Sequence, residues 1–353
     1  MTPGGAGVGP VAAVDCGTNS TRLLVLGPDR RRLARRMRIT RLGAGVDRTG
    51  RLEDAAIGRT FAVLEEYRRL LDEHGVDTGP GTKSVRAAAT SATRDAGNAA
   101  AFLDGAESIL GVRPEVIEGT EEGRLSYLGA TAELDPTTGP YLVVDIGGGS
   151  TELIVGHLPS DGVRRAPAAA EAAEAVEAAE AAEAVEAAEA VAAVVSLDVG
   201  CVRLTERYLP SDPPTTDELA AAHSAVRELI DRARDREPAY KTANRMIGLA
   251  GTVSALTVMA LGLDGFDEKL VHHARISRAE IEDLAARLAS VPLAERRQLR
   301  GMEVERADVI VGGAIVLQEV MDSFGIGEFT ASESDILDGI AFQLLDTRQQ
   351  AAD

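Results

Sequence analysis

The stretch VAAVDCGTNSTRLLVL, residues 11–26, has two short apolar runs on either side of the polar turn DCGTNS. A tight turn containing glycine between two such runs predicts a β-hairpin. The same arrangement returns at residues 141–155, YLVVDIGGGSTELIV, where Asp-x-Gly again directly follows an apolar run. A repeat of this size predicts an α/β protein with two similarly folded halves rather than one large sheet.

The remainder of the chain alternates apolar periodic segments with turn signals. Residues 83–88 and 112–117 are typical of strands, and helices are expected at 54–74, 98–110, 121–134, 215–236, 277–290, 307–321 and 335–345. The breaker cluster DPTTGP, residues 135–140, marks a domain boundary. We therefore expect one domain at residues 11–136, a second at 140–345, and flexible tails at 1–10 and 346–353.

A low-complexity tract of Ala, Glu and Val occupies residues 168–195 and contains seven Glu, one at every third position. Ala and Glu favour helices, but this spacing drifts around a helix and leaves no apolar stripe. We expect an exposed helix or a disordered insert in the second domain, between strands near 153–156 and 194–197. We assign no chemistry to it.

The composition excludes several classes of function. The 353 residues include 37 basic and 56 acidic side chains, a formal charge of −19, which disfavours binding to nucleic acid or to an anionic membrane. Cys16 and Cys201 form no CxxC pair, so no disulfide framework or thiolate metal cluster is expected. The uncharged run 246–263 is interrupted by glycines and is typical of a buried strand, turn and helix rather than a membrane span. The first residues lack the pattern of a signal peptide, so a cytoplasmic location is expected.

The negative charge is not spread evenly along the chain. Residues 30–51 contain nine arginines against the single acid Asp47. This segment is either a solvated hairpin face or a basic track that leads a phosphate chain toward the first turn.

Both turns contain the groups that hold a phosphate. Glycine lets the backbone approach closely, and backbone amides and hydroxyls donate to phosphate oxygens. An Asp directly before such a turn commonly holds a divalent cation. Each turn alone could be a hairpin turn capped by Asp, but two copies favour a cleft with phosphate cradles on both walls. The candidate phosphate-binding residues are Gly17, Thr18, Asn19, Ser20 and Arg22 in the first turn, and Gly147, Gly148, Gly149, Ser150 and Thr151 in the second.

Three further segments have functional interpretations. Gly251 and Thr252 lie in a third glycine-rich turn before a helix, where the helix N-terminus favours an anion. Arg94 follows the strand at 83–88, where ligands usually approach, although it could equally be a surface arginine. Glu121 and Glu122 begin a helix, where they either stabilise its dipole or align a water molecule for attack on a phosphoryl group. The chemistry alone does not decide between these two roles.

The segments VDCGTNSTRLLV, ATSATRDA, EVIEGTEEGRLSYLGA, VVDIGGGSTELIVG and GLAGTVSAL occur in this order over nearly the whole chain. Together they resemble the exopolyphosphatase / guanosine pentaphosphate phosphohydrolase (Ppx/GppA) phosphatase family, in its short two-domain form. The resemblance implies two RNase H-like domains of the actin-like ATPase superfamily that flank an interdomain cleft. It also implies hydrolysis of the terminal phosphate of inorganic polyphosphate, and in some members of guanosine pentaphosphate, with Mg²⁺ (or Mn²⁺), in a homodimer.

The resemblance also assigns roles to single residues. Glu122 matches the catalytic base, with its neighbour Glu121 as the alternative. Asp15 and Asp145 match the pair that flanks the scissile phosphate and its cation, and Glu152 matches a further acidic metal ligand beside Asp145.

The chain departs from the family in two places. It ends near residue 353 without the extra C-terminal helical domains of longer members, which puts processive action on long chains in question. The segment SDILDG, residues 334–339, stands where many members have Arg-Glu-Gly, so a contact made by that arginine is not expected here.

Two alternative functions remain open at this stage. One is an ATP-dependent kinase or ATPase of the same superfamily. The other is a non-catalytic sensor that binds polyphosphate or an alarmone. The clustered carboxylates argue against the sensor, because a pure anion binder does not need them beside its ligand.

Overall fold

The first hairpin forms the centre of a five-stranded sheet with the order β3-β2-β1-β4-β5. β1 (Val11–Cys16) pairs antiparallel with β2 (Ser20–Leu26), which pairs antiparallel with β3 (Arg32–Ile39). On its other side β1 runs parallel to β4 (Val85–Ala89), and β4 to the two-residue β5 (Glu115–Val116). The computed structural model describes residues 9–79, 81–135, 138–157 and 191–350.

The second hairpin repeats this topology in a six-stranded sheet with the order β10-β11-β9-β6-β7-β8. Its strands are β6 (Tyr141–Ile146), β7 (Thr151–Gly156), β8 (Val191–Leu197), β9 (Arg245–Leu249), β10 (Arg275–Ser277) and β11 (Glu328–Ala331). β6-β7-β8 are antiparallel and β6-β9-β11 parallel, as in the first sheet. The turns match as well: Gly17 N–H donates to Ser20 O, and Gly147 N–H to Ser150 O, both at 3.0 Å. The expectation of two RNase H-like α/β domains is confirmed.

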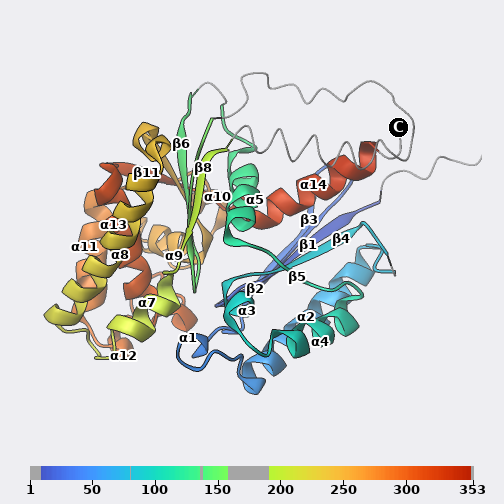
Figure 1. Cartoon of the computed structure of the whole chain (residues 1–353), viewed down its shortest axis with the longest axis horizontal. Coiled ribbons are helices and arrows are strands. Elements are labelled where there is room, and N and C mark those ends of the chain that lie inside the picture. Colours follow the sequence, from blue (N-terminus) through green and yellow to red (C-terminus); the bar gives the residue numbers. More distant parts are fainter. Residues whose placement is uncertain (1–8, 80, 136–137, 158–190, 351–353) are drawn as a thin grey trace, which may run out of the picture.

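Helices form three layers, one on each side of the two sheets and one between them (Figure 1). The first domain contributes α1 (Val46–Thr49), α2 (Asp54–Glu73), α3 (Ser91–Asp95), α4 (Ala99–Leu110) and α5 (Gly119–Thr131). Residues 191–350 contain α7 (Cys201–Tyr208), α8 (Thr216–Arg236), α9 (Ala250–Ala260), α10 (Glu268–Val271), α11 (Arg278–Ser290), α12 (Leu293–Arg296), α13 (Ile310–Phe324) and α14 (Ile336–Gln350), with short 3₁₀ helices at Pro238–Thr242 and Val304–Arg306.

The alternation of side chains along each central strand explains the layers, because successive residues of a strand point to opposite faces. In β1, Ala12 and Val14 pack with α2 and α4, whereas Val11 and Ala13 pack against α14. In β6, the alternate residues Leu142, Val144 and Ile146 face α8 and α13. The other face of β6 packs against Tyr127 and Ala130 of α5. Helices α5 and α14 therefore fill the space between the two sheets (Figure 1).

The structure corrects several boundaries. Helix α14 falls within the expected second domain but packs against the first sheet. It continues to Gln350, so residues 346–350, expected in a flexible tail, are helical, and Arg348 donates to Ser84 Oγ at 2.5 Å. Residues 191–195, assigned to the Ala/Glu insert, belong to β8. The strand expected at 112–117 is reduced to β5. The rest of the insert, from 168 to 190, and residues 1–8 and 351–353 lie outside the described residues.

Helices α5 and α14 cross with their backbones in contact. A Cβ added at Gly129 of α5 would lie 1.9 Å from Asp335 O, and one added at Gly339 of α14 would lie 2.1 Å from Leu125 O. Only glycine allows this approach, because any side chain would overlap the facing backbone. The crossing fixes the start of α14 beside the middle of α5.

None of the helices in the described part of the chain is long and apolar enough to cross a membrane. The run 246–263 instead forms β9 and α9, as the sequence predicted.

The crossing predicts that Gly339→Ala lowers the free energy of unfolding by about 3 kcal/mol, because the new methyl group forces two backbones apart. The matched control is Gly58→Ala in α2, where an added Cβ meets nothing within 4 Å. That change should stabilise the protein by about 0.5–1 kcal/mol. Urea denaturation followed by circular dichroism measures both, and equal small effects would contradict the backbone crossing.

Candidate active site

The two hairpin turns face each other across a cleft of about 50 Å³ between the domains. Most of the residues predicted from the sequence line it. They are Asp15, Gly17, Thr18, Asn19, Ser20, Arg22, Glu122, Asp145, Gly147, Gly148, Gly149, Ser150, Gly251 and Thr252. Turns from both sheets and the start of α9 therefore meet at one place, as the internal repeat implied. Thr151, Glu152 and Arg94 lie outside this lining.

The second turn contains glycines at the positions where it contacts the first domain. A Cβ at Gly148 would lie 3.0 Å from the Thr18 Cβ, and one at Gly149 would lie 2.6 Å from Ser91 Oγ and 2.9 Å from Thr18 Oγ1. Side chains at these positions would hold the turns apart. The close approach keeps the cleft narrow and brings the backbone amides of both turns toward the same small volume.

Glu122 enters the cleft from the first turn of α5. Its side chain is 13% exposed, and its Oε2 accepts a hydrogen bond from Arg94 Nη1 at 3.1 Å. Burial, together with the nearby charges of Asp15 and Asp145, raises the pKa of Glu122 to about 8 against the attraction of Arg94. A carboxylate with a pKa near neutrality is suited to accept a proton from water.

The neighbour Glu121 points elsewhere. Its carboxylate lies 3.7 Å from the guanidinium of Arg86, is 39% exposed, and does not line the cleft. Between the two alternatives left open by the sequence, the geometry favours Glu122 as the base.

Arg94 is engaged by the protein rather than free for a ligand. Its Nη1 donates to Ile117 O at 2.7 Å as well as to Glu122. Its predicted role in phosphate binding remains a prediction. In this structure Arg94 orients the carboxylate of Glu122 through a charge-assisted hydrogen bond.

Two serines hold the two acids that the resemblance assigns to the cation. Ser126 Oγ, one turn after Glu122 on α5, donates to Asp145 Oδ2 at 2.8 Å. Ser196 Oγ of β8 donates to Glu152 Oε1 at 2.7 Å. Each acid thus has one oxygen fixed by a serine. The sequence analysis missed both serines, although the spacing of four residues between Glu122 and Ser126 puts them on one helix face.

The acids in the cleft and directly beside it are crowded and buried. Burial raises the pKa of Asp145 to about 6, with Arg22 opposing the shift and Asp335 adding to it. Burial, followed by the charges of Glu122 and Asp145, raises the pKa of Glu152 well above its ordinary value. Burial and the neighbouring acids thus make a negative charge on Asp145 and Glu152 costly, in spite of the nearby Arg22.

The residues present fit a hard divalent cation. Asp15 Oδ1 and Glu152 Oε2 are buried oxygens with no hydrogen-bond partner among the described residues, and the buried amide Asn19 Nδ2 is likewise unpaired there. Carboxylate oxygens are among the ligands that Mg²⁺ and Mn²⁺ prefer, and a bound cation favours the charged form of these buried acids. Asp145 and Glu152 would hold such an ion from the protein side, and water and substrate oxygens would complete its shell.

A second group of potential metal ligands is less suitable. Ligand atoms of Glu133, His272 and His273 lie within 4.8 Å of one another. However, His272 Nδ1 accepts the Glu333 N–H at 3.0 Å, so the ring proton resides on Nε2, which faces Glu133 at 3.2 Å. Both nitrogens of His272 are thus occupied by hydrogen bonds.

A larger cavity of about 540 Å³ opens beyond the cleft. Ser20, Arg22, Ala250, Gly251 and Arg306 line both. Arg306 is 5% exposed, and its guanidinium packs on Gly251, where an added Cβ would lie 2.2 Å from it. The sequence analysis missed Arg306, because nothing near it in the chain distinguishes it from other arginines.

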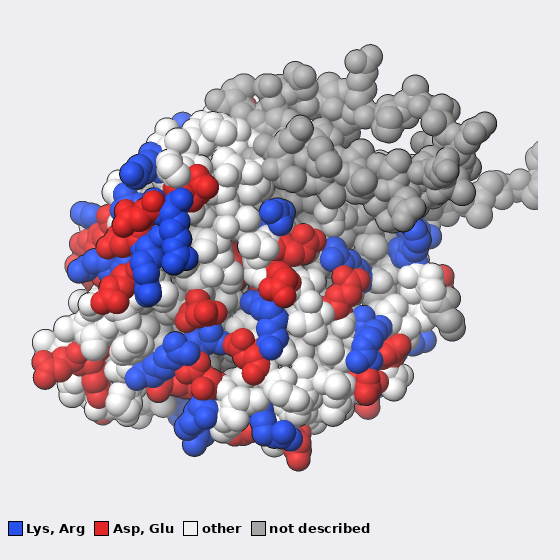
Figure 2. All heavy atoms as spheres, in the orientation of Figure 1, with Lys and Arg blue, Asp and Glu red and all other residues white. Residues whose placement is uncertain are grey.

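The arginine-rich segment 30–51, all of it described, is not a continuous basic track. Arg30, Arg32, Arg35, Arg38 and Arg41 each form an ion pair with a carboxylate. On the face of the molecule shown in Figure 2, groups of Lys and Arg lie interspersed with groups of Asp and Glu, without one large basic patch. The segment is therefore closer to the alternative of a hairpin face with paired charges.

The repeated sheets and the cleft between them define a protein of two RNase H-like domains. A model of the Ppx/GppA phosphatase family matches residues 30–348. Exopolyphosphatase 2 of Mycobacterium tuberculosis is 39% identical over 350 residues, which cover 95% of this chain and 98% of the relative. The chain belongs to the Ppx/GppA phosphatase family.

Two solved structures support this assignment. The crystal structure of an exopolyphosphatase-like protein matches with a TM-score of 0.81 and 38% identity, covering 94% of this chain and 98% of that one. The Ppx/GppA family member of Aquifex aeolicus matches with a TM-score of 0.72 and 29% identity, covering 96% of this chain and 98% of that one.

The raised pKa of Glu122 predicts a pH-dependent stability of the metal-free protein. The folded chain keeps this proton up to a pH of about 8, whereas an ordinary Glu loses it near 4.5. The contribution of protonated Glu122 to the free energy of unfolding is therefore complete below pH 4.5. It is lost as the pH rises from 4.5 to 8, by about 1 kcal/mol per pH unit. Denaturation in EDTA should show this decline in the wild type and a flatter profile in Glu122→Gln; parallel profiles would contradict it.

Proposed function

We propose that the protein is an exopolyphosphatase that hydrolyses the terminal phosphate of inorganic polyphosphate. The observation that supports this most strongly is the convergence of two glycine-rich turns and the buried carboxylates of Glu122 and Asp145 on one narrow cleft. The turns supply backbone donors for phosphate oxygens, and the carboxylates supply a base and a cation ligand. The name of the M. tuberculosis relative is in agreement with this activity.

In this proposal the end of the phosphate chain lies between the two turns, and Glu122 orients a water molecule in line with the terminal phosphorus. The hydrogen bond from Arg94 fixes one oxygen of Glu122, so the other can accept the proton of the water. Backbone amides of the turns hold the phosphoryl oxygens while the bond to the leaving chain breaks. Phosphoryl transfer depends mainly on positioning and charge neutralisation, which these groups provide.

A divalent cation, Mg²⁺ or Mn²⁺, is part of the proposal. When bound, it would neutralise charge on the phosphoryl oxygens. Asp145 and Glu152 would hold it, and Ser126 and Ser196 keep these two acids in place through their hydrogen bonds. The surplus of carboxylates in the cleft is the physical reason for including the ion.

Guanosine pentaphosphate is a second candidate substrate. The larger cavity contains the 58% exposed Phe266 together with Val258 and Met302, which provide apolar surface for a nucleoside beside the arginines. The same cavity could accept the nucleoside of ATP, so the alternative function of an ATP-dependent kinase or ATPase also has to be tested. A homodimer and a cytoplasmic location remain predictions from the family resemblance.

The substrate is tested by phosphate release from polyphosphate, guanosine pentaphosphate and ATP, measured side by side with Mg²⁺ and with Mn²⁺. The proposal predicts release from polyphosphate at a kcat/KM well above that for ATP. A preference for ATP with transfer to an acceptor would support the kinase instead. Binding of polyphosphate without turnover in either metal would support a non-catalytic sensor.

The role of Glu122 is tested by Glu122→Gln, with Glu121→Gln as the matched control. Loss of a general base typically costs 10²–10⁴-fold, so phosphate release from polyphosphate should fall by roughly 10²-fold or more while binding remains. Glu121→Gln should retain most of the activity, because that side chain lies outside the cleft. Wild-type rates in Glu122→Gln would remove Glu122 from the mechanism.

A further inference from the structure

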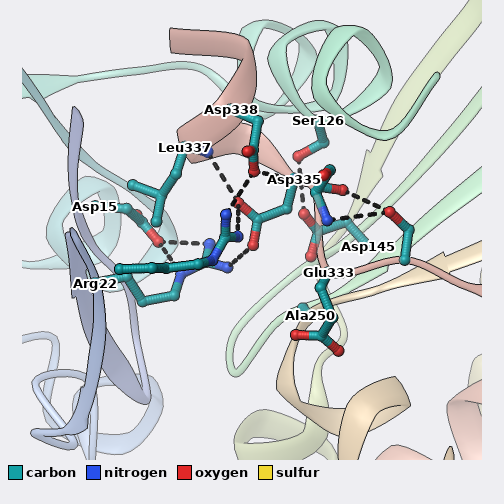
Figure 3. Close-up of polar contacts among 12 residues, drawn as sticks. Asp15, Arg22, Ser126, Asp145, Ala250, Glu333, Asp335, Leu337 and Asp338 are labelled. Carbon is teal, nitrogen blue, oxygen red and sulfur yellow. Dashed lines mark hydrogen bonds and ion pairs between the residues drawn. The ribbon is translucent and has the colours of Figure 1, made fainter. Parts of the chain in front are cut away.

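Asp335 lies between two arginines at the junction of the cleft and the larger cavity. It directly precedes α14, and its Oδ2 accepts a hydrogen bond from Arg22 Nη1 at 2.5 Å. Its Oδ1 lies 3.1 Å from Arg35 Nη2 and accepts the Leu337 N–H at 3.0 Å. Figure 3 shows the side chains of Asp15, Arg22 and Asp335 directed at one another across the junction. The crossing of α14 over α5 fixes this position.

Arg22 is already neutralised without Asp335. Its Nε and Nη2 donate to Asp15 Oδ2 at 2.8 and 2.6 Å, so one buried carboxylate balances its charge. Asp335 adds a second carboxylate to the same guanidinium. The sequence analysis assigned Arg22 to phosphate binding, but an arginine flanked by two carboxylates has no net positive charge to offer an incoming phosphate.

Asp335 is ionised in this environment. Burial acts to raise its pKa, but Arg22 and Arg35 outweigh burial and hold the pKa below its ordinary value. Its side chain is only 7% exposed, so water screens these interactions poorly. Water therefore weakens the attraction between the negative charge of Asp335 and the guanidinium of Arg22 only slightly.

The charges of the larger cavity balance. Its lining contains five arginines and five acidic residues: Arg22, Arg35, Arg36, Arg38, Arg306, Asp264, Glu268, Glu303, Glu333 and Asp335. Beyond the junction the cavity adds no net attraction for a polyanion. Arg22 lines both the cleft and the cavity, so a phosphate chain that extends from one to the other passes this guanidinium, where Asp335 contributes the second negative charge.

We propose that Asp335 competes with the phosphate oxygens of the substrate for Arg22 and so limits how tightly the cleft holds a phosphate chain. The inference rests on the proposed function of the cleft. Phosphate and carboxylate oxygens are equivalent acceptors for a guanidinium. A phosphate that enters displaces Asp335 from Nη1 of Arg22, while Arg35 retains the displaced carboxylate. When the product leaves, Asp335 returns to Arg22, which favours release.

The test is Asp335→Asn, which removes the charge but keeps an oxygen for the Leu337 amide. Calorimetry with tripolyphosphate and with inorganic phosphate is carried out in the Glu122→Gln background, where turnover is blocked, with Mg²⁺ present. We expect both anions to bind about tenfold more tightly than in Glu122→Gln alone. The reason is that the anion no longer has to displace a charged hydrogen-bond partner from Arg22. In the otherwise wild-type enzyme, KM and the inhibition constant for inorganic phosphate should fall without a rise in kcat.

The matched control is Asp338→Asn. Asp338 lies at the start of the same helix, is equally buried, and pairs with Arg35 at 2.7 Å, but none of its contacts is with Arg22. Its replacement should leave the affinity for both anions unchanged. A purely structural effect would weaken binding in both variants, whereas competition tightens it in Asp335→Asn alone.

Weaker or unchanged binding in Asp335→Asn, an equal gain in Asp338→Asn, or no binding to any variant would overturn the proposal. If Asp335→Asn does not fold, Asp335→Ser removes the same charge and retains a hydroxyl acceptor for the helix start. Failure of the proposed function is seen separately, as absence of phosphate release from polyphosphate by the wild type. The binding comparison stands independently of that result.

Discussion

The backbone contact between α5 and α14 is the constraint on which the cleft depends. Helix α5 carries Glu122 and Ser126 against the second sheet, and the start of α14 brings Asp335 to Arg22 of the first. Gly129 and Gly339 allow the two helices to meet without side chains between them. A wider crossing would move Glu122 and Asp145 away from Arg22 and Asp335, even if both sheets were intact.

Electrostatic crowding explains why a strongly acidic protein can be proposed to act on a polyanion. The net charge of −19 describes the whole surface, but the cleft is governed by a few buried groups. There burial, followed by the charges of neighbouring acids, raises the pKa values of Glu122 and Asp145. The proposed divalent cation would relieve the repulsion and attract the phosphate oxygens of the substrate locally. The net charge of the rest of the protein then matters little for the reaction.

The sequence predicted those features that depend on neighbouring residues. The turns at 15–20 and 145–150 were identifiable because apolar strands flank Asp, Gly and hydroxyl residues in an order that repeats, and Glu122 because its segment resembles a known family. Arg306, Ser126 and Asp335 were not identified as site residues. Their roles arise from contacts between elements far apart in the chain, and local sequence does not encode the partner of an isolated Arg, Ser or Asp. The arginines at 30–51 were misleading for the same reason, since their acidic partners lie in other segments.

The most direct measurement of the central claim is proton release on binding of Mg²⁺ or Mn²⁺ near neutral pH, obtained by calorimetry in buffers of different ionisation enthalpy. A cation held by Asp145 and Glu152 should expel the protons that burial and repulsion keep on the carboxylates of the cleft, because metal ligands must be deprotonated. We predict binding with net proton release that is reduced in Glu122→Gln. Binding without proton release, or no binding, would contradict a cation site built from these carboxylates.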